Sequence, residues 1–495
     1  MTVLVDLARG CTFDDFLFTP QYSVIERRDP AAISLTSRLS EHLTLARPIV
    51  SANMDTITRA EMAIAIAEEG GIGIVDRGFR SGDLEPQVRE VATVKRRQHG
   101  TIPDPYTIPA SATLQTAREM MRRTGVGSLV VLEDHGRVAG LLTTRDLRFV
   151  PDGTSRVADR MTPRERLIVH TGPLDAGPAE ALMRTHKIKK LPLLTPEGAL
   201  AGLITAKDLL KQRELPFATR DGQGRLRVGA AIGATGDYLE RATELHRVGV
   251  DLIVIDIAHG HSAVMGRAID AFRKQFGDAE MIAGNVATAE GVRFLLDRGV
   301  NGIKVGIGSG GGCTTRLNTN FGVPQVEALL RCRDATGGTV PLIADGGIRR
   351  DGAVIQALLF GGDTVMLGSM LAGTTETPGD TVQKPVVIPD SHKTVKVPFK
   401  VFRGMASLQA IVDRLDVEDA EAADVEALGA EGIEVSVPAR GSVRPVVRSL
   451  LKHLCSAISY GGAQSLAELQ ERVRRDPARY LIRLTGPARR ESFER

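Results

Sequence analysis

The chain has 495 residues, of which 42% are hydrophobic and 25% are charged, and its formal net charge is +3. This length allows two or three domains with sizeable cores, and so small a net charge gives no electrostatic footprint for nucleic acid or membrane. Tryptophan is absent and aromatic residues make up only 4%, so base-stacking surfaces are not expected.

Neither the cysteines nor the N-terminus indicates secretion. The four cysteines are Cys11, Cys313, Cys332 and Cys455, whose spacing matches neither a disulfide framework nor a metal site. The N-terminal segment lacks a basic region followed by an apolar core, so we expect no signal peptide. Charges interrupt the longest apolar tracts within about 15 residues, too soon for a membrane span. We therefore predict a cytoplasmic protein.

Short apolar runs that alternate with helix-like segments predict a parallel β-sheet. Most of these runs continue into helical segments, such as residues 236–248 and 289–297. Eight such units indicate an α/β fold of the (β/α)8 (TIM) barrel type, with a doubly wound open sheet as the alternative. The eight predicted strands are residues 48–54, 71–76, 227–232, 251–257, 281–286, 302–308, 341–345 and 363–368.

Polar residues and glycines cluster where these strands end, which is the edge where barrels carry their active sites. Asn53-Met54-Asp55 follows the first strand, residues 256–260 follow the fourth, and Gly284-Asn285 lies on the fifth. Asp345-Gly346-Gly347 and Gly368-Ser369 follow the seventh and eighth strands, where many barrels bind phosphate. A tight turn explains any one of these glycines, but their shared position indicates a site.

The segment 304–325 ends the sixth strand in a glycine cluster, followed by Cys313, two threonines and Arg316. Glycines let the backbone approach a ligand closely, and a thiol on such a loop can act as a nucleophile. The alternative is a flexible loop with an incidental cysteine, since most free cysteines are small buried hydrophobes.

An internal repeat fills the long gap between the second and third strands. Its copies, residues 106–150 and 161–212, contain the matching motifs GLLTTRD and GLITAKD. The repeat resembles a pair of cystathionine-β-synthase-type (CBS) modules, in which the threonine and aspartate of each motif hold the ribose of adenine or guanine nucleotides. This resemblance implies a regulatory site with the residues Thr143, Thr144, Asp146, Thr205 and Asp208. A purely architectural insertion is the alternative.

After the eighth strand, Phe402-Arg403-Gly404-Met405 precedes an acidic segment, residues 408–430, and then Glu431. Low hydrophobicity and charge favour a mobile flap, with a solvated helix face as the alternative. From Arg440 onward we expect one or two closing helices and a basic end.

Five motifs together resemble the inosine-monophosphate dehydrogenase and guanosine-monophosphate reductase family over nearly the whole chain. They are residues 51–56, 284–288, 306–308 with 313–316, 344–348 and 403–405. A CBS pair inserted after the second strand is the dehydrogenase-like arrangement. The resemblance implies a barrel from residues 1–97 and 216–495, with a catalytic loop at 304–325 and a mobile flap at 404–434. The CBS module would span 98–215, with copies at about 102–150 and 157–213.

The resemblance also implies roles for single residues. Cys313 matches the thiol that adds to purine C2 in both activities. The implied substrate-binding residues, with Asp345 on the ribose, are Met54, Gly311, Asp345, Gly347, Gly368, Ser369, Gly404 and Met405. The implied cofactor-binding residues are Asp256, Ala258, Asn285, Gly306 and Gly308, whereas His259 is either a cofactor contact or a surface residue. The backbone carbonyls of Gly308, Gly310 and Cys313 would hold a monovalent cation such as K⁺.

Two regions separate the activities of the family. The dehydrogenase activates water with an Arg-Tyr pair on its flap, but here Arg414 is followed by Leu415, and no tyrosine lies between Ser407 and Tyr460. The reductase uses a threonine two residues after the nucleophile and a glutamate at the flap end, which Thr315 and Glu431 match. The segment DIAHGHS, residues 256–262, is also closer to the reductase's Asp-Val-Ala-Asn-Gly-Tyr-Ser than to the dehydrogenase's Asp-Ser-Ser-Gln-Gly.

We therefore predict an NADPH-dependent GMP reductase of purine salvage, which converts GMP to IMP and ammonia. ATP or GTP would act on the CBS pair, and the resemblance implies a homotetramer, or an octamer joined through the CBS modules. The alternatives are an IMP dehydrogenase with an atypical flap, which would use NAD⁺, and a catalytically silent nucleotide sensor. The chain departs from the family at Gly311, where a serine hydroxyl would reach the phosphate, and at Phe402, which often is a phosphate-binding tyrosine.

Overall fold

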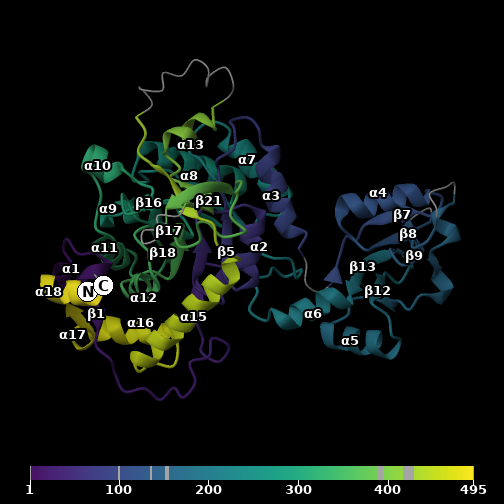
Figure 1. Cartoon of the computed structure of the whole chain (residues 1–495), viewed down its shortest axis with the longest axis horizontal. Helices are drawn as coiled ribbons and strands as arrows, with labels where there is room; N and C mark the ends of the chain where they lie inside the picture. Colours follow the sequence, from purple (N-terminus) through teal and green to yellow (C-terminus); the bar gives the residue numbers. More distant parts are fainter. Residues whose placement is uncertain are drawn as a thin grey trace. The chain divides into compact units, whose positions relative to one another are not determined.

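The computed structural model describes residues 2–97, 101–133, 136–150, 155–387, 394–415 and 429–493. The chain forms two units (Figure 1). One comprises Met1–Arg97, Phe217–Thr219 and Leu226–Arg495, and the other comprises Gln98–Pro216 and Arg220–Arg225. The insertion expected at 98–215 and the second unit thus cover almost the same residues.

Eight parallel strands close a barrel in the first unit. Their hydrogen-bonded order is β14-β15-β16-β17-β18-β19-β4-β5, and β5 pairs with β14 to complete the ring. Each strand lies within one of the eight predicted ranges, so the barrel is confirmed and the open sheet was wrong. The strands are β4 (Ile49–Ser51), β5 (Ile72–Val75), β14 (Gly229–Ile232), β15 (Leu252–Asp256), β16 (Met281–Val286), β17 (Gly302–Val305), β18 (Leu342–Asp345) and β19 (Thr364–Leu367).

Helices cover the outside of the ring, which explains why the strands read as continuous apolar runs. Ser262 and Thr288 start two of these helices by accepting a hydrogen bond from a backbone N–H in the first turn. Ala63 belongs to α2 (Ala60–Glu68), which packs on β5. A Cβ at Gly73 of β5 would lie 2.4 Å from the Cα of Ala63, so only glycine lets α2 pack directly on this strand. The helices are α2 (Ala60–Glu68), α3 (Glu85–Lys95), α7 (Tyr238–Arg247), α8 (Ala263–Phe276), α9 (Ala289–Leu296), α11 (Gln325–Thr336) and α12 (Asp351–Leu359).

The remaining elements of this unit surround the barrel. A three-stranded antiparallel sheet consists of β20 (Val382–Val387), β21 (Thr394–Arg403) and β22 (Glu434–Pro438), and α13 (Leu408–Val412) follows β21. The C-terminal part forms α15 (Val443–Tyr460), α16 (Leu466–Arg475), α17 (Pro477–Tyr480) and α18 (Gly486–Phe493), more helices than the one or two predicted. The two ends of the chain lie side by side, since β1 (Phe16–Phe18) pairs with β23 (Leu481–Arg483) (Figure 1).

The second unit consists of two similar four-stranded sheets. Each has a central antiparallel pair, β8–β9 or β12–β13, and a third strand parallel to one of that pair. At the end of each copy, a threonine hydroxyl donates to an aspartate three residues on: Thr143 to Asp146 at 2.7 Å and Thr205 to Asp208 at 2.5 Å. The two copies of the repeat therefore fold alike. The strands are β6 (Thr101–Ile102), β7 (Thr107–Pro109), β8 (Ser128–Leu132), β9 (Val138–Thr143), β10 (Thr162–Pro163), β11 (His170–Thr171), β12 (Lys190–Leu194) and β13 (Leu200–Thr205), and the helices are α4 (Leu114–Thr124), α5 (Ala176–Thr185) and α6 (Ala206–Glu214).

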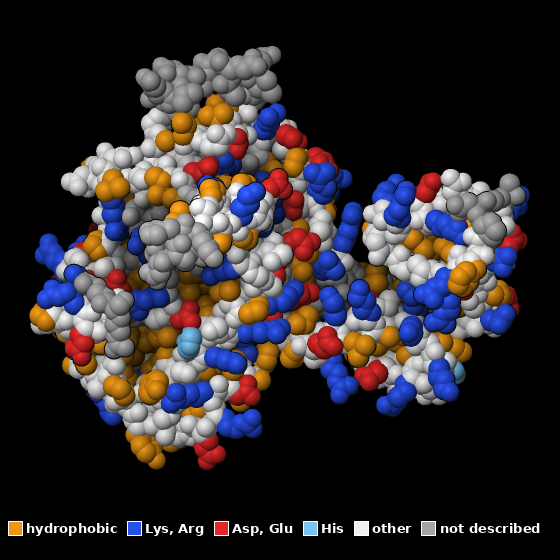
Figure 2. Space-filling model, in the orientation of Figure 1, with side chains coloured by type: hydrophobic (Ala, Val, Ile, Leu, Met, Phe, Trp, Pro, Cys, Tyr) orange, Lys and Arg blue, Asp and Glu red, His pale blue; other side chains and the backbone are white. Residues whose placement is uncertain are grey.

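The surface agrees with the small net charge. Figure 2 shows basic and acidic side chains interspersed over the described residues of one face. None of the helices in the described ranges is both long enough and apolar enough to cross a membrane. Most of the acidic segment predicted to be a flap, residues 416–428, lies outside the described residues.

Candidate active site

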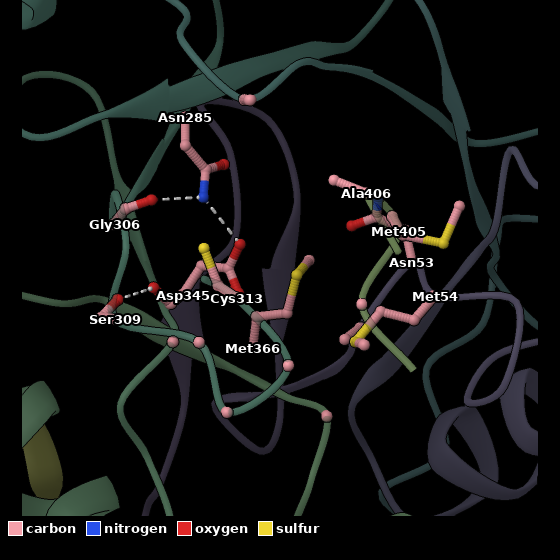
Figure 3. Close-up of a pocket in the computed structure, with 18 of the residues that line it drawn as sticks. Asn53, Met54, Asn285, Gly306, Ser309, Cys313, Asp345, Met366, Met405 and Ala406 are labelled. Carbon is pink, nitrogen blue, oxygen red and sulfur yellow. Dashed lines mark hydrogen bonds between the residues drawn. The ribbon is translucent and has the colours of Figure 1, made fainter. Parts of the chain in front are cut away.

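A cavity of about 350 Å³ opens at the carboxyl ends of the barrel strands (Figure 3). Loops after seven of the eight strands contribute to its wall, together with residues 402–414 and Glu431. Because parallel strands end at one edge of the ring, residues far apart in sequence meet there. Met54 and Met405 lie on the side of the cavity opposite Asn285 and Asp345 (Figure 3).

All predicted catalytic, substrate-binding, cofactor-binding and cation-binding residues lie in this one wall. His259 does not line the cavity and is exposed. The predicted nucleotide-regulatory residues belong to the second unit. The predicted residues in the wall are Met54, Asp256, Ala258, Asn285, Gly306, Gly308, Gly310, Gly311, Cys313, Thr315, Asp345, Gly347, Gly368, Ser369, Gly404, Met405 and Glu431.

A short hydrogen-bonded chain joins the Cys313 thiol to a carboxylate. The sulfur lies 3.2 Å from Thr315 Oγ1, and the Thr315 hydroxyl donates to Glu431 Oε2 at 2.6 Å. Thr315 is the first residue of α10 (Thr315–Thr319), which begins directly after the glycine-rich loop. A thiol, a hydroxyl and a carboxylate in this order can pass a proton along the chain.

Backbone hydrogen bonds fix Glu431 in this position. Its N–H donates to Ala406 O at 3.0 Å, and its carbonyl accepts from Thr314 N at 2.8 Å. Two residues later, Ile433 N donates to Gly312 O at 3.0 Å. A Cβ at Gly404 would lie only 2.4 Å from Gly312 O, so the approach of these two backbones requires glycine. The glutamate segment is thus tied to both the cysteine loop and the segment after β21.

A buried lysine in the cavity wall lies between two carboxylates. Lys304 Nζ lies 2.8 Å from Asp256 Oδ1 and 2.7 Å from Asp345 Oδ2. Burial alone would lower the pKa of Lys304, but the two carboxylates hold it above its ordinary value. Burial would likewise raise the pKa of Asp256, but Lys304, Arg77 and Asn53 together hold it below its ordinary value. Lys304 and Asp256 therefore stay charged at neutral pH.

Asn285 completes this network. Its Nδ2 donates to Asp345 Oδ2 at 2.9 Å and to Gly306 O at 2.7 Å (Figure 3). Its Oδ1 is buried and has no hydrogen-bond partner among the described residues. A buried amide oxygen without a partner is suited to accept a hydrogen bond from a ligand.

Sequence reasoning missed four basic residues in the cavity wall as functional candidates, namely Arg77, Lys304, Arg349 and Arg414. A lysine within an apolar strand was the signal for Lys304, and the strand-end positions were the signal for Arg77 and Arg349. Arg414 was considered only as half of a missing pair. Its Nη1 donates to Met405 O at 2.8 Å, and burial, reinforced by nearby Arg77, lowers its pKa to about 10.

The predicted carbonyl site for K⁺ is partly engaged within its own loop. Gly310 O accepts a hydrogen bond from Cys313 N at 3.1 Å. Arg316 packs against the same loop, since a Cβ at Gly308 would lie 2.5 Å from Arg316 Cγ. The Gly310 carbonyl oxygen keeps a second lone pair, so the cation site stays a prediction. In the described ranges, no cluster of three or more His, Cys, Asp or Glu side chains is suited to a metal ion.

Comparisons with known proteins point in two directions. A sequence model described as "IMP dehydrogenase / GMP reductase domain" matches residues 10–493. The chain is 39% identical to inosine-5'-monophosphate dehydrogenase of Aquifex aeolicus over 488 residues, covering 98% of this chain and 95% of that protein. It is 40% identical to the protein of the same name from Halalkalibacterium halodurans, with the same coverage.

The similar solved structures are of proteins named GMP reductase. A Cys-to-Ala variant of GMP reductase from Trypanosoma brucei, in complex with guanosine 5'-monophosphate, matches with a TM-score of 0.86 and 37% identity over 98% of this chain and 97% of that one. The GMP reductase from the same organism in complex with guanosine 5'-triphosphate matches with a TM-score of 0.77 and 33% identity, over 98% and 100% of the two chains.

Proposed function

Because the chain belongs to the IMP dehydrogenase / GMP reductase family, we propose that it is a GMP reductase that uses NADPH to convert GMP into IMP and ammonia. The observation that carries this proposal is the hydrogen-bonded chain from Cys313 through Thr315 to Glu431. Loss of an amine requires a proton at the leaving nitrogen, and this chain supplies one beside the sulfur that attacks the same carbon.

In the first half-reaction, the Cys313 sulfur adds to C2 of the purine. The thiol proton moves through the Thr315 hydroxyl to Glu431 and returns by the same route to the exocyclic amine. The S–C2 bond forms, the C2–N bond breaks, and the thiol proton leaves on ammonia. Glu431 begins and ends this half-reaction as a carboxylate, so no further acid or base is needed.

For the second half-reaction, Asp256, Ala258 and Asn285 would hold NADPH, which would supply a hydride to C2. The Cys313 sulfur leaves as a thiolate when the S–C2 bond breaks, IMP is released, and one proton from solution returns to the sulfur through Glu431 and Thr315. The cavity has polar groups suited to the nicotinamide nucleotide. Asn285 Oδ1 and Arg77 Nε are buried without hydrogen-bond partners among the described residues. Ionised Asp256 is suited to accept from a ribose hydroxyl.

The proposed substrate site uses the remaining wall. Asp345 would accept from the ribose hydroxyls of GMP, and Met54 and Met405 would contact the base. The phosphate would lie against Gly311, Gly347, Gly368, Ser369 and Gly404, where glycines let backbone N–H groups approach an anion.

The second unit would regulate this site. ATP or GTP would bind at two places, with Thr143, Thr144 and Asp146 at one and Thr205 and Asp208 at the other. A similar structure, the GMP reductase of Trypanosoma brucei, is in complex with guanosine 5'-triphosphate. We further propose a homotetramer through the barrels, joined into octamers through the second units.

One observation favours IMP dehydrogenase as the second candidate. Arg414 lies in the cavity wall, and burial lowers its pKa to about 10. A lowered pKa leaves a larger fraction of the arginine neutral, and only the neutral form can accept a proton from water. The similar curated proteins are also named IMP dehydrogenase. Against it, residue 415 is leucine, so the tyrosine that would assist the arginine is absent.

The absorbance of reduced nicotinamide tests both candidates. Purified protein is given GMP with NADPH in one cuvette and IMP with NAD⁺ in another, and ammonia is assayed in parallel. Loss of absorbance with an equal amount of ammonia in the first cuvette alone supports the reductase. A gain in the second cuvette alone refutes it and identifies the dehydrogenase. Silence in both, with and without ATP or GTP, would favour the catalytically silent nucleotide sensor. Cys313→Ala is the control for both reactions.

A further inference from the structure

We propose that Arg349 binds the phosphate of the purine nucleotide, an assignment that rests on the proposed function only in its choice of a purine mononucleotide as ligand. The cavity wall after β18 and β19 offers few other side-chain donors. Gly346, Gly347 and Gly368 supply backbone N–H groups alone, and Ser369 adds a hydroxyl after β19. Phe402, which is 4% exposed, has no hydroxyl to offer, and Gly311 has no side chain. A positive charge beside these N–H groups would strengthen the binding of a phosphate dianion.

Arg349 is the available cation in this wall. Of the four basic residues that line the cavity, Lys304 is already bound to Asp256 and Asp345. Arg77 faces Asp256 at 3.7 Å, and Arg414 donates to Met405 O. Arg349 makes no ion pair within 4.0 Å and no hydrogen bond from its side chain to any described residue. Its guanidinium donors are thus free for a ligand.

The order of the strands places Arg349 on the phosphate side. It follows Gly346 and Gly347 in the loop after β18, and the neighbouring strand β19 leads to Gly368 and Ser369. The loop after β17 closes the same corner. A Cβ at Gly346 would lie 2.4 Å from Ser309 Oγ, and one at Gly311 would lie 3.9 Å from Ser369 Cβ. Arg77 follows β5, which pairs with β14 on another part of the ring.

The adjacent residue, Arg350, has different contacts and is therefore a matched control. Arg350 Nη2 lies 2.5 Å from Asp14 Oδ1, and its guanidinium carbon lies 4.1 Å from the centroid of the Phe493 ring. Arg350 does not line the cavity. Two neighbouring residues of the same type therefore differ in one respect that matters here, namely access to the ligand.

Arg349 is exposed, so water and salt weaken its interaction with the phosphate. A charge-assisted hydrogen bond under these conditions corresponds to about a tenfold change in affinity. The effect must depend on the phosphate. A nucleoside, which has the same base and ribose but no phosphate, would not sense the substitution.

The test is calorimetric titration of the full-length protein with GMP, IMP and guanosine in the absence of cofactor. We expect Arg349→Gln to lower the affinity for GMP and IMP about tenfold and to leave the affinity for guanosine unchanged. Arg349→Lys should restore most of the loss, and Arg350→Gln should bind all three ligands as the wild type does. The proposal is overturned if Arg349→Gln binds GMP as tightly as wild type, or if it weakens guanosine to the same degree.

Ionic strength gives a second readout, which remains usable if guanosine binds too weakly to measure. Wild-type affinity for GMP should fall more steeply with added sodium chloride than that of Arg349→Gln, because one charge pair is screened in the wild type alone. Equal slopes would contradict the assignment. If wild-type protein binds neither GMP nor IMP, the proposed function fails instead, so the two failures are distinguishable.

Discussion

Replacing Glu431 with glutamine tests the proton relay directly. The Thr315 hydroxyl donates to Glu431 Oε2 at 2.6 Å, and the amide oxygen of glutamine can accept the same bond. The backbone bonds of Glu431 to Ala406 and Thr314 do not involve the side chain, so the position of residue 431 is kept. What the glutamine lacks is the capacity to take and return a proton.

General acid–base catalysis by one group typically contributes a factor of about 100 to 10,000, which sets the expected loss in the rate of ammonia release. Affinity for GMP should change little, because the substitution alters the relay and not the phosphate site. The measurement is single-turnover release of ammonia from GMP, beside calorimetric titration with GMP. Thr315→Ser keeps the hydroxyl and should remain active, whereas Thr315→Val should resemble Glu431→Gln.

The double variant separates a relay from two independent contributions. If Thr315 and Glu431 act as one path, Thr315→Val combined with Glu431→Gln should be about as slow as either single variant. Ammonia release by Glu431→Gln within threefold of the wild-type rate would refute the relay. So would equal losses in ammonia release and GMP affinity, because they would indicate a distorted site.

Three further predictions concern the surroundings of the site. Arg403→Gln removes the partner of nearly buried Asp55, to which Arg403 Nη2 lies at 2.6 Å, and should lower the free energy of unfolding by about 3 kcal/mol in chemical denaturation. Burial raises the pKa of Asp76 to about 6 from 3.8, so the folded state holds a proton that the unfolded state releases between these values. The free energy of unfolding should therefore fall by roughly 3 kcal/mol in total as pH rises from about 3 to about 7, and Asp76→Asn should lose this dependence. Gly404→Ala places a Cβ 2.4 Å from Gly312 O and should abolish measurable turnover while the circular dichroism spectrum of the folded protein is kept.

The barrel could be predicted because its physical signature is local. A strand buried on both faces must be apolar throughout, so each strand could be predicted from its own residues without knowing which strands lie beside it. The predicted carboxyl ends of the strands were less accurate, because the active-site loops begin there. The run 302–308 stops at Val305 as a strand, since Gly306 turns away with a φ of 147°. The residues at such strand ends line the cavity and do not pair in the sheet, so their sequence does not follow the strand pattern.

The charged part of the site could not be predicted in the same way. Lys304 meets Asp256 and Asp345 because β15, β17 and β18 end at one edge of the ring, and Asp55 meets Arg403 because the end of β21 contacts the loop after β4. Nothing in the spacing of these residues shows which cation faces which carboxylate. Family resemblance carried over the positions of Cys313, Thr315 and Glu431, but it gave no reason to single out Arg77 or Arg349.

Arg414 and Glu431 lie in the same cavity wall, and each is a candidate for proton transfer, but their surroundings differ. Burial lowers the pKa of Arg414 to about 10, yet at pH 7 only about one guanidinium in a thousand would be neutral. Arg414 therefore makes a weak base when no tyrosine assists it. Glu431, by contrast, is joined to the Cys313 sulfur through a single hydroxyl. This arrangement favours protonation of an amine that leaves from the carbon bound to sulfur over generation of hydroxide to attack it. Arg414 without a tyrosine at residue 415 is thus better suited to the proposed reduction than to hydrolysis.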